Sequence, residues 1–109
     1  MKYVKKPIPV ECYTWDEVIQ DFHEEKFVKN VVMHTNVKGD INGATFEINN
    51  RTMKWDPING VMRIGTLEGE MTMQRADILI IGVRGECYPC RGDIFEETYE
   101  LYVENHNFN

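Results

Sequence analysis

The residues best suited to chemistry are two closely spaced cysteines near the C-terminal end of the chain. Cys87 and Cys90 enclose Tyr88-Pro89 in a C-x-x-C motif, a spacing that serves dithiol redox chemistry or half of a zinc site. A redox dithiol places its attacking thiol at a helix N-terminus, whereas the next helical signal here begins only at Asp93. The motif therefore lacks the element that would lower the pKa of its thiol.

A zinc site is weakly supported, because a structural zinc needs four ligands and the sequence holds no second closely spaced pair. The remaining candidate ligands stand alone: Cys12, His23, His34 and His106. No phosphate-binding glycine loop or recognisable nucleophile signature is present either. We therefore predict no enzyme activity, no metal and no cofactor, and we keep a thiol or zinc protein using Cys87 and Cys90 as an alternative.

Acidic residues form the second candidate set, in two segments of the chain. Residues 7–25 contain no Lys or Arg, and residues 86–109 contain Arg91 alone. Acidic side chains four residues apart on one helical face, such as Glu17 and Asp21, destabilise a helix by about 0.2–0.5 kcal/mol per pair. Such a stripe is either a solvated face or a contact surface for a basic partner. The candidate partner-binding residues are Glu17, Asp21, Glu24, Glu25, Glu97, Glu100 and Glu104.

Length and composition limit the remaining possibilities. A chain of 109 residues, 42% hydrophobic, indicates one folded domain over residues 1–109. The net charge of −6 argues against direct binding to nucleic acid or to an anionic membrane surface. No apolar run approaches the roughly 18 residues of a membrane-spanning helix. Three cysteines cannot form a complete disulfide framework, so a reducing cytoplasm is the expected compartment.

One amphipathic helix is predicted near the N-terminus. Thr14-Trp15-Asp16-Glu17 fits a capping box, with Thr14 as the N-cap and Glu17 reaching back to it. An apolar stripe with helical spacing follows: Trp15, Val18, Ile19 and Phe22. We expect this helix to end near Lys29 and Asn30.

In the rest of the chain, apolar runs between turn signals predict short strands. Glu68-Gly69 marks a tight hairpin turn, Asn49-Asn50 marks another turn, and a short helical turn is expected at Asp93. The continuous apolar run 77–83 is the expected central strand. The expected strands are 8–13, 31–35, 45–48, 61–67, 71–73, 77–83 and 98–103. We therefore predict an α+β fold: one N-terminal helix on a strongly bent, barrel-like, mostly antiparallel sheet of six or seven short strands.

Four short motifs form a recognisable pattern: residues 6–11 (KPIPVE), 66–71 (TLEGEM), 82–90 (GVRGECYPC) and 93–100 (DIFEETYE). Together they resemble a group of small phage and prophage proteins without an assigned biochemical role. The resemblance covers both ends of the chain and is weak over about residues 30–60, an expected variable, insertion-like region. Relatives typically carry Ala at position 12 and Phe or Leu at position 87, so Cys90 alone among the cysteines matches the pattern.

The resemblance implies a phage or prophage origin and a bacterial host cytoplasm. With no catalytic constellation and a net charge of −6, we expect a protein that binds a host protein, its acidic surface facing a basic groove that normally holds nucleic acid. An anti-CRISPR or other anti-defence inhibitor fits this description. A virion structural or assembly component, self-associating through an exposed sheet edge, is a further alternative, and a homodimer is left open.

Overall fold

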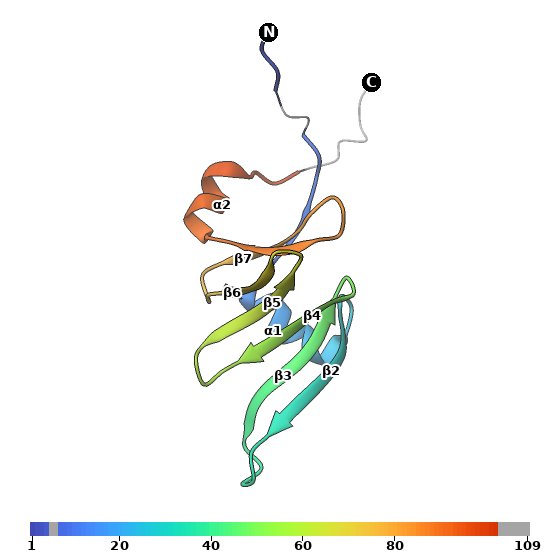
Figure 1. The fold of residues 1–109 in the computed structure, drawn as a ribbon, viewed down its shortest axis with the longest axis vertical. Coiled ribbons are helices and arrows are strands. Elements are labelled where there is room, and N and C mark those ends of the chain that lie inside the picture. The colour runs from blue at the N-terminus through green and yellow to red at the C-terminus, as the bar shows by residue number, and fades with distance from the viewer. Residues whose placement is uncertain (5–6, 103–109) are drawn as a thin grey trace.

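The computed structural model, which describes residues 1–4 and 7–102, is an α+β fold with two antiparallel sheets (Figure 1). The strands are β1 (Glu11–Thr14), β2 (Val28–Thr35), β3 (Ile41–Ile48), β4 (Arg51–Asp56), β5 (Val61–Thr66), β6 (Gly69–Met73), β7 (Ile78–Ile81) and β8 (Cys87–Cys90). The helices are α1 (Trp15–Glu24) and α2 (Gly92–Thr98). The larger sheet is the meander β2-β3-β4-β5-β6, and the smaller sheet has the order β1-β7-β8.

The predicted α+β class and antiparallel pairing are confirmed, but the prediction of one barrel-like sheet is wrong. Among the residues described, the strands form two sheets and no closed barrel. The connections explain the two sheets. Each strand from β2 to β6 pairs with the strand next to it in sequence, whereas β7 pairs with β1, which is far from it in sequence. α1 follows the first strand, β1, and a second helix, α2, follows the last strand.

Helix α1 begins as its sequence predicts. The Glu17 amide donates to Thr14 Oγ1 at 3.2 Å, and the Thr14 amide donates to Glu17 Oε1 at 2.9 Å, which completes the capping box. The predicted end near Lys29 and Asn30 is wrong, because the helix stops at Glu24 and Glu25 takes the left-handed conformation with φ 49°. A left-handed residue at this point reverses the chain and ends the helix.

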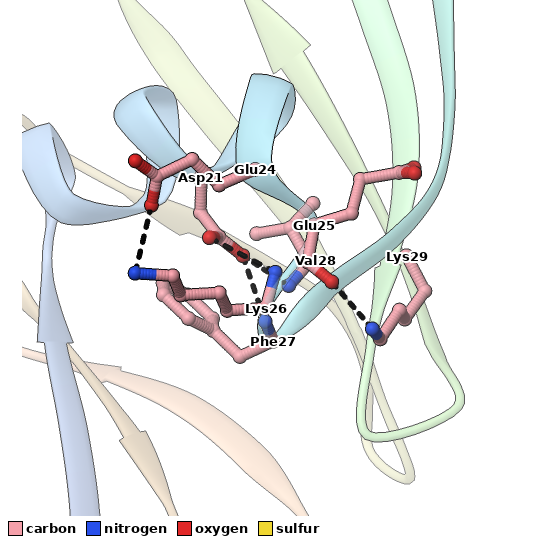
Figure 2. A network of polar contacts seen from close by, with 7 residues as sticks. All are labelled: Asp21, Glu24, Glu25, Lys26, Phe27, Val28 and Lys29. Carbon is pink, nitrogen blue, oxygen red and sulfur yellow. Dashed lines mark hydrogen bonds and ion pairs between the residues drawn. The ribbon is translucent and has the colours of Figure 1, made fainter.

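A buried carboxylate explains why the chain leaves the helix early. Asp21 is 3% exposed, and its carboxylate accepts hydrogen bonds from the backbone amides of Lys26, Phe27 and Val28 at 3.0, 2.8 and 2.7 Å (Figure 2). Burial raises the pKa of Asp21, but the three amide donors outweigh it and hold that pKa below its ordinary value. We call this group of contacts the Asp21 clamp; it fixes the connection from α1 into β2.

The core lies between α1, the inner face of the larger sheet and one face of the smaller sheet. The ring of Phe22 on α1 lies 4.9 Å from that of Phe46 and 5.9 Å from that of Trp55, centroid to centroid. The buried apolar residues of this core are Trp15, Val18, Phe22, Val28, Ala44, Phe46, Ile48, Met53, Met62, Ile64, Met73, Leu79 and Cys87. The segment 30–60 thus supplies Ala44, Phe46, Ile48 and Met53 to the core.

Local signals located several strands correctly. The hairpin around Glu68-Gly69 is confirmed between β5 and β6, where Gly69 has φ 112°. The central strand is confirmed as β7, which pairs with β1 on one side and β8 on the other. The Asn49-Asn50 turn is also confirmed, with φ 51° and 64°, although the strand β4 that follows it was not predicted.

Both ends of the chain differ from the prediction. The first strand begins only at Glu11, after the two prolines that cannot donate to a ladder. The strand predicted over 98–103 is wrong for its described part, since Thr98 ends α2 and residues 99–102 have no regular structure. Tyr99 instead stacks on Phe95, with ring centroids 5.1 Å apart, so its side chain packs on α2 and does not extend a sheet.

The Asp21 clamp predicts a large stability cost for Asp21→Asn. An amide can keep one acceptor oxygen, but its NH₂ group would face a backbone amide that also donates. We expect a loss of about 2–3 kcal/mol in the free energy of unfolding, measured by urea titration. Asp16→Asn, at an exposed position of the same helix, is the matched control and should change stability by less than about 1 kcal/mol.

The same carboxylate makes stability depend on pH in a defined direction. Because the pKa of Asp21 lies below its ordinary value of 3.8 in the folded chain, the unfolded chain binds the proton more tightly. The stabilisation is therefore complete above the ordinary pKa and is lost as pH falls through the folded pKa. The difference in unfolding free energy between the parent and Asp21→Asn should shrink between about pH 5 and pH 2. A difference that stays constant over that range would contradict the clamp.

Candidate functional site

The two cysteines of the C-x-x-C motif lie at opposite ends of β8. Side chains alternate along a strand, so residues three apart point to opposite faces of the sheet. Their Cα atoms are separated by about 10 Å at the usual rise of a strand, beyond the roughly 7 Å that a disulfide can bridge. Strand geometry therefore removes the basis for a dithiol pair at Cys87 and Cys90, and all three cysteines are free.

Cys87 behaves as a core residue. Its side chain is 2% exposed, and its Sγ donates to the Ile48 carbonyl at 3.7 Å. Burial raises the pKa of the Cys87 thiol to about 11, which keeps the nucleophilic thiolate scarce at neutral pH. Cys90 is half-buried and its Sγ donates to the neighbouring Arg91 carbonyl at 3.6 Å.

The zinc alternative gains no support within residues 1–4 and 7–102. No group of three or more His, Cys, Asp or Glu side chains in this part of the chain is arranged to hold a metal ion. Cys12 is exposed on β1, and His34 Nε2 lies 2.8 Å from Thr45 Oγ1 on the outer face of the larger sheet. His106, another candidate zinc ligand, lies outside the described residues.

The acidic residues of α1 do not form the single exposed face that their spacing predicts. Asp21 is buried in its clamp, so its placement on a partner-binding surface is wrong. Glu17 remains exposed but closes the capping box, and Glu24 is ion-paired with Lys26 at 3.2 Å. Glu25 is exposed and ends the helix. Each of these four acidic residues makes a structural contact or adopts a special backbone conformation at one end of α1. The acidic face of α1 is therefore a weaker candidate for a partner-binding surface.

The acidic residues at the C-terminal end of α2 have no such role. Glu96, Glu97 and Glu100 are exposed, and none of them forms an ion pair within the described residues. Glu104 lies outside those residues. Glu96 and Glu97 occupy the last turn of α2 and Glu100 follows it, where the helix dipole already places partial negative charge. This arrangement is electrostatically unfavourable for the isolated protein.

Helix α2 itself is held by few contacts. It buries no residue and its N-cap, Arg91, makes no side-chain capping bond. Beyond the Phe95–Tyr99 stack, the side chain of Tyr99 lies close to Tyr88 on β8; burial, followed by this proximity to Tyr99, raises the pKa of Tyr88 to about 12. α2 lies beside the smaller sheet, at the end of the molecule remote from the β2–β3 hairpin (Figure 1). It thus presents its carboxylates on an outlying element.

A cleft of about 310 Å³ opens where the two sheets meet, and no local sequence pattern indicates it. One wall is a parallel stack of Tyr13 from β1 and Phe27 from the α1–β2 connection, with ring centroids 3.8 Å apart and planes 4° apart. The Asn49-Asn50 turn also lines the cleft. Asn49 Nδ2 donates to the Gly85 carbonyl at 2.8 Å and joins the larger sheet to the β7–β8 loop. We refer to this feature as the inter-sheet cleft.

The edge strand β2 bears on the self-association alternative. It has hydrogen-bonded neighbours only on its β3 side, and Val32 and Met33 are exposed by 55% and 41%. Its register with β3 is interrupted between Lys29 and Val32 and again between His34 and Thr35. Bulges of this kind protect natural edges from pairing with another chain, so the strand does not favour assembly through its edge.

Comparisons of the chain with protein-family models, with curated proteins and with solved structures gave no match. The resemblance to small phage proteins therefore stays a prediction from the sequence motifs. Within residues 1–4 and 7–102, no helix is both long and apolar enough to cross a bilayer.

The geometry of β8 predicts how the thiols react. Treated with iodoacetamide at about pH 8, the native protein should be alkylated at exposed Cys12 and spared at Cys87, whose thiol is buried and has a pKa raised to about 11. Peptide mapping gives the result, and the urea-unfolded chain, alkylated at all three positions, is the control. Rapid native alkylation of Cys87, or an oxidised mass indicating a Cys87–Cys90 bridge, would contradict the placement.

Proposed function

We propose that this protein is a small, acidic, phage-encoded protein that inhibits a bacterial host protein by direct contact, in the host cytoplasm and without catalysing a reaction. The observation that carries the proposal is the acidic end of α2, formed by Glu96, Glu97 and Glu100. These exposed carboxylates form no ion pair within the described residues.

The dipole of α2 makes carboxylates at its C-terminal end unfavourable in the free protein. A carboxylate near a helix C-terminus costs about 0.3–1 kcal/mol, and Glu96 and Glu97 both lie in the last turn of α2, with Glu100 just beyond it. The helix tolerates this arrangement although it buries no residue that would offset the cost. A basic surface docked at this end would relieve this cost, so the same charges that weaken the free helix favour a complex.

The net charge of −6 defines the kind of partner. Complementary charge accelerates association and selects partners more than it adds affinity. A groove that holds nucleic acid is lined by Lys and Arg, and an acidic protein can occupy it in place of the phosphate backbone. CRISPR effectors and other nucleic-acid-binding defence proteins are therefore the proposed targets.

The direct test is capture of a partner followed by competition. Tagged protein is incubated with bacterial host lysate at low and at high salt, and the bound proteins are identified by mass spectrometry. We expect a stoichiometric nucleic-acid-binding protein that is released by salt and by its own nucleic acid. A captured protein that binds its nucleic acid equally well in the presence of this chain would contradict inhibition.

Removing charge from the acidic end of α2 should weaken the complex. We expect Glu97→Gln combined with Glu100→Gln to reduce affinity about threefold to tenfold at low salt, because exposed ion pairs contribute about 0.2–1 kcal/mol each. Surface-plasmon resonance against the captured partner gives the constants. Asp16→Asn combined with Glu68→Gln changes net charge by the same amount elsewhere on the surface and should leave affinity within about twofold. Equal losses in both double variants would show that only net charge matters and would overturn the assignment to α2.

A further inference from the structure

We infer that the inter-sheet cleft binds the guanidinium group of an arginine side chain. The assignment of that arginine to the host partner rests on the proposed function, whereas the affinity of the cleft for a guanidinium group does not. Three features of the cleft support guanidinium binding: its charged side chains, its aromatic wall and its size.

Two carboxylates that line the cleft, Glu11 and Glu47, form no ion pair within the part of the chain that the structure describes. Glu11 accepts a hydrogen bond from the Tyr13 hydroxyl at 2.9 Å, and Glu47 accepts one from the side-chain amide of Asn30. Both donors are neutral, and neither carboxylate takes part in an ion pair within residues 1–4 and 7–102. The two negative charges at the cleft are therefore positioned by hydrogen bonds but not compensated by them.

The lysines that line the same cleft are engaged by the end of α1 (Figure 2). Lys26 Nζ lies 3.2 Å from the carboxylate of Glu24, and Lys29 Nζ donates to the backbone carbonyl of Glu25. A carbonyl at a helix C-terminus is a favourable partner for an ammonium group, because the helix dipole adds to the attraction. Lys29 stands opposite Glu47 in the β2–β3 register, but its Nζ contacts the Glu25 carbonyl and forms no ion pair with Glu47. Within the described residues, the carboxylates of Glu11 and Glu47 thus have no ion-pair partner that a guanidinium group would have to displace.

The aromatic wall distinguishes one cation from another. Tyr13 and Phe27 both line the cleft, are half-buried and stack on one another in parallel, and an aromatic ring face attracts a cation. A planar guanidinium stacks on such a face and donates two parallel hydrogen bonds to a carboxylate, whereas an ammonium group is a compact point charge. The volume of about 310 Å³ is at the small end of ligand sites and suits a single side chain.

The test titrates the isolated protein with N-acetylarginine methylamide while ¹⁵N–¹H spectra are recorded. We expect saturable shifts centred on the amides of Tyr13, Phe27 and Asn30, with a dissociation constant on the order of millimolar for so small a probe. The equivalent lysine derivative should bind at least about fivefold more weakly. Its ammonium group cannot stack on an aromatic ring and at the same time donate two parallel hydrogen bonds to a carboxylate. The neutral citrulline derivative should give no saturable shift. Non-saturating shifts, or equal binding of arginine and lysine derivatives, would overturn the inference.

Variants locate the binding. Glu11→Gln and Glu47→Gln should each weaken arginine binding about fivefold or more, since a charge-assisted hydrogen bond becomes neutral. Glu68→Gln, at the exposed β5–β6 turn, removes the same charge and should leave binding unchanged. Thermal melts of all three proteins show whether they remain folded. If Glu68→Gln weakens binding as much as the cleft variants, the probe is responding to net charge and the site does not exist.

The outcome is separable from that of the proposed function. The titration needs no host protein, and Glu97→Gln combined with Glu100→Gln should leave arginine binding unchanged because α2 does not line the cleft. Saturable arginine binding without a captured host partner supports the cleft and counts against inhibition. A captured, inhibited partner without arginine binding supports inhibition and overturns the cleft.

Discussion

The Asp21 clamp is the interaction on which the rest of the structure depends. One buried carboxylate accepts three consecutive backbone amides, and this ends α1, turns the chain and starts β2. The turn places Val28 in the core and brings Phe27 onto the ring of Tyr13. The wall of the inter-sheet cleft and the first strand of the larger sheet therefore follow from the same contact.

Local sequence signals predicted those elements whose cause is local. The capping box at Thr14 and Glu17, the β5–β6 turn at Gly69 and the apolar run of β7 each depend on residues within a few positions of one another. The role of Asp21 was not predictable in this way. Its spacing matches a solvated acidic face, and only the return of residues 26–28 over the helix end shows that it is buried.

The candidate site shows the same division between local and distant contacts. The spacing of Cys87 and Cys90 indicates chemistry only if they share one face of a turn or helix, and the extended β8 places them on opposite faces. The inter-sheet cleft joins residues from β1, the α1–β2 connection and the β3–β4 turn, which are far apart in sequence. The acidic end of α2 was visible in the sequence as charge, but its lack of internal partners required the fold.

Amide hydrogen exchange at the Asp21 clamp tests the central claim most directly. The claim is that Asp21 is a structural acceptor and not part of a binding surface. In the unmodified protein, the amides of Lys26, Phe27 and Val28 should exchange about as slowly as core amides of β3, because opening them requires global unfolding. Exchange at these three amides as fast as in the exposed β2–β3 turn would contradict the account, and would return Asp21 to the acidic surface of α1.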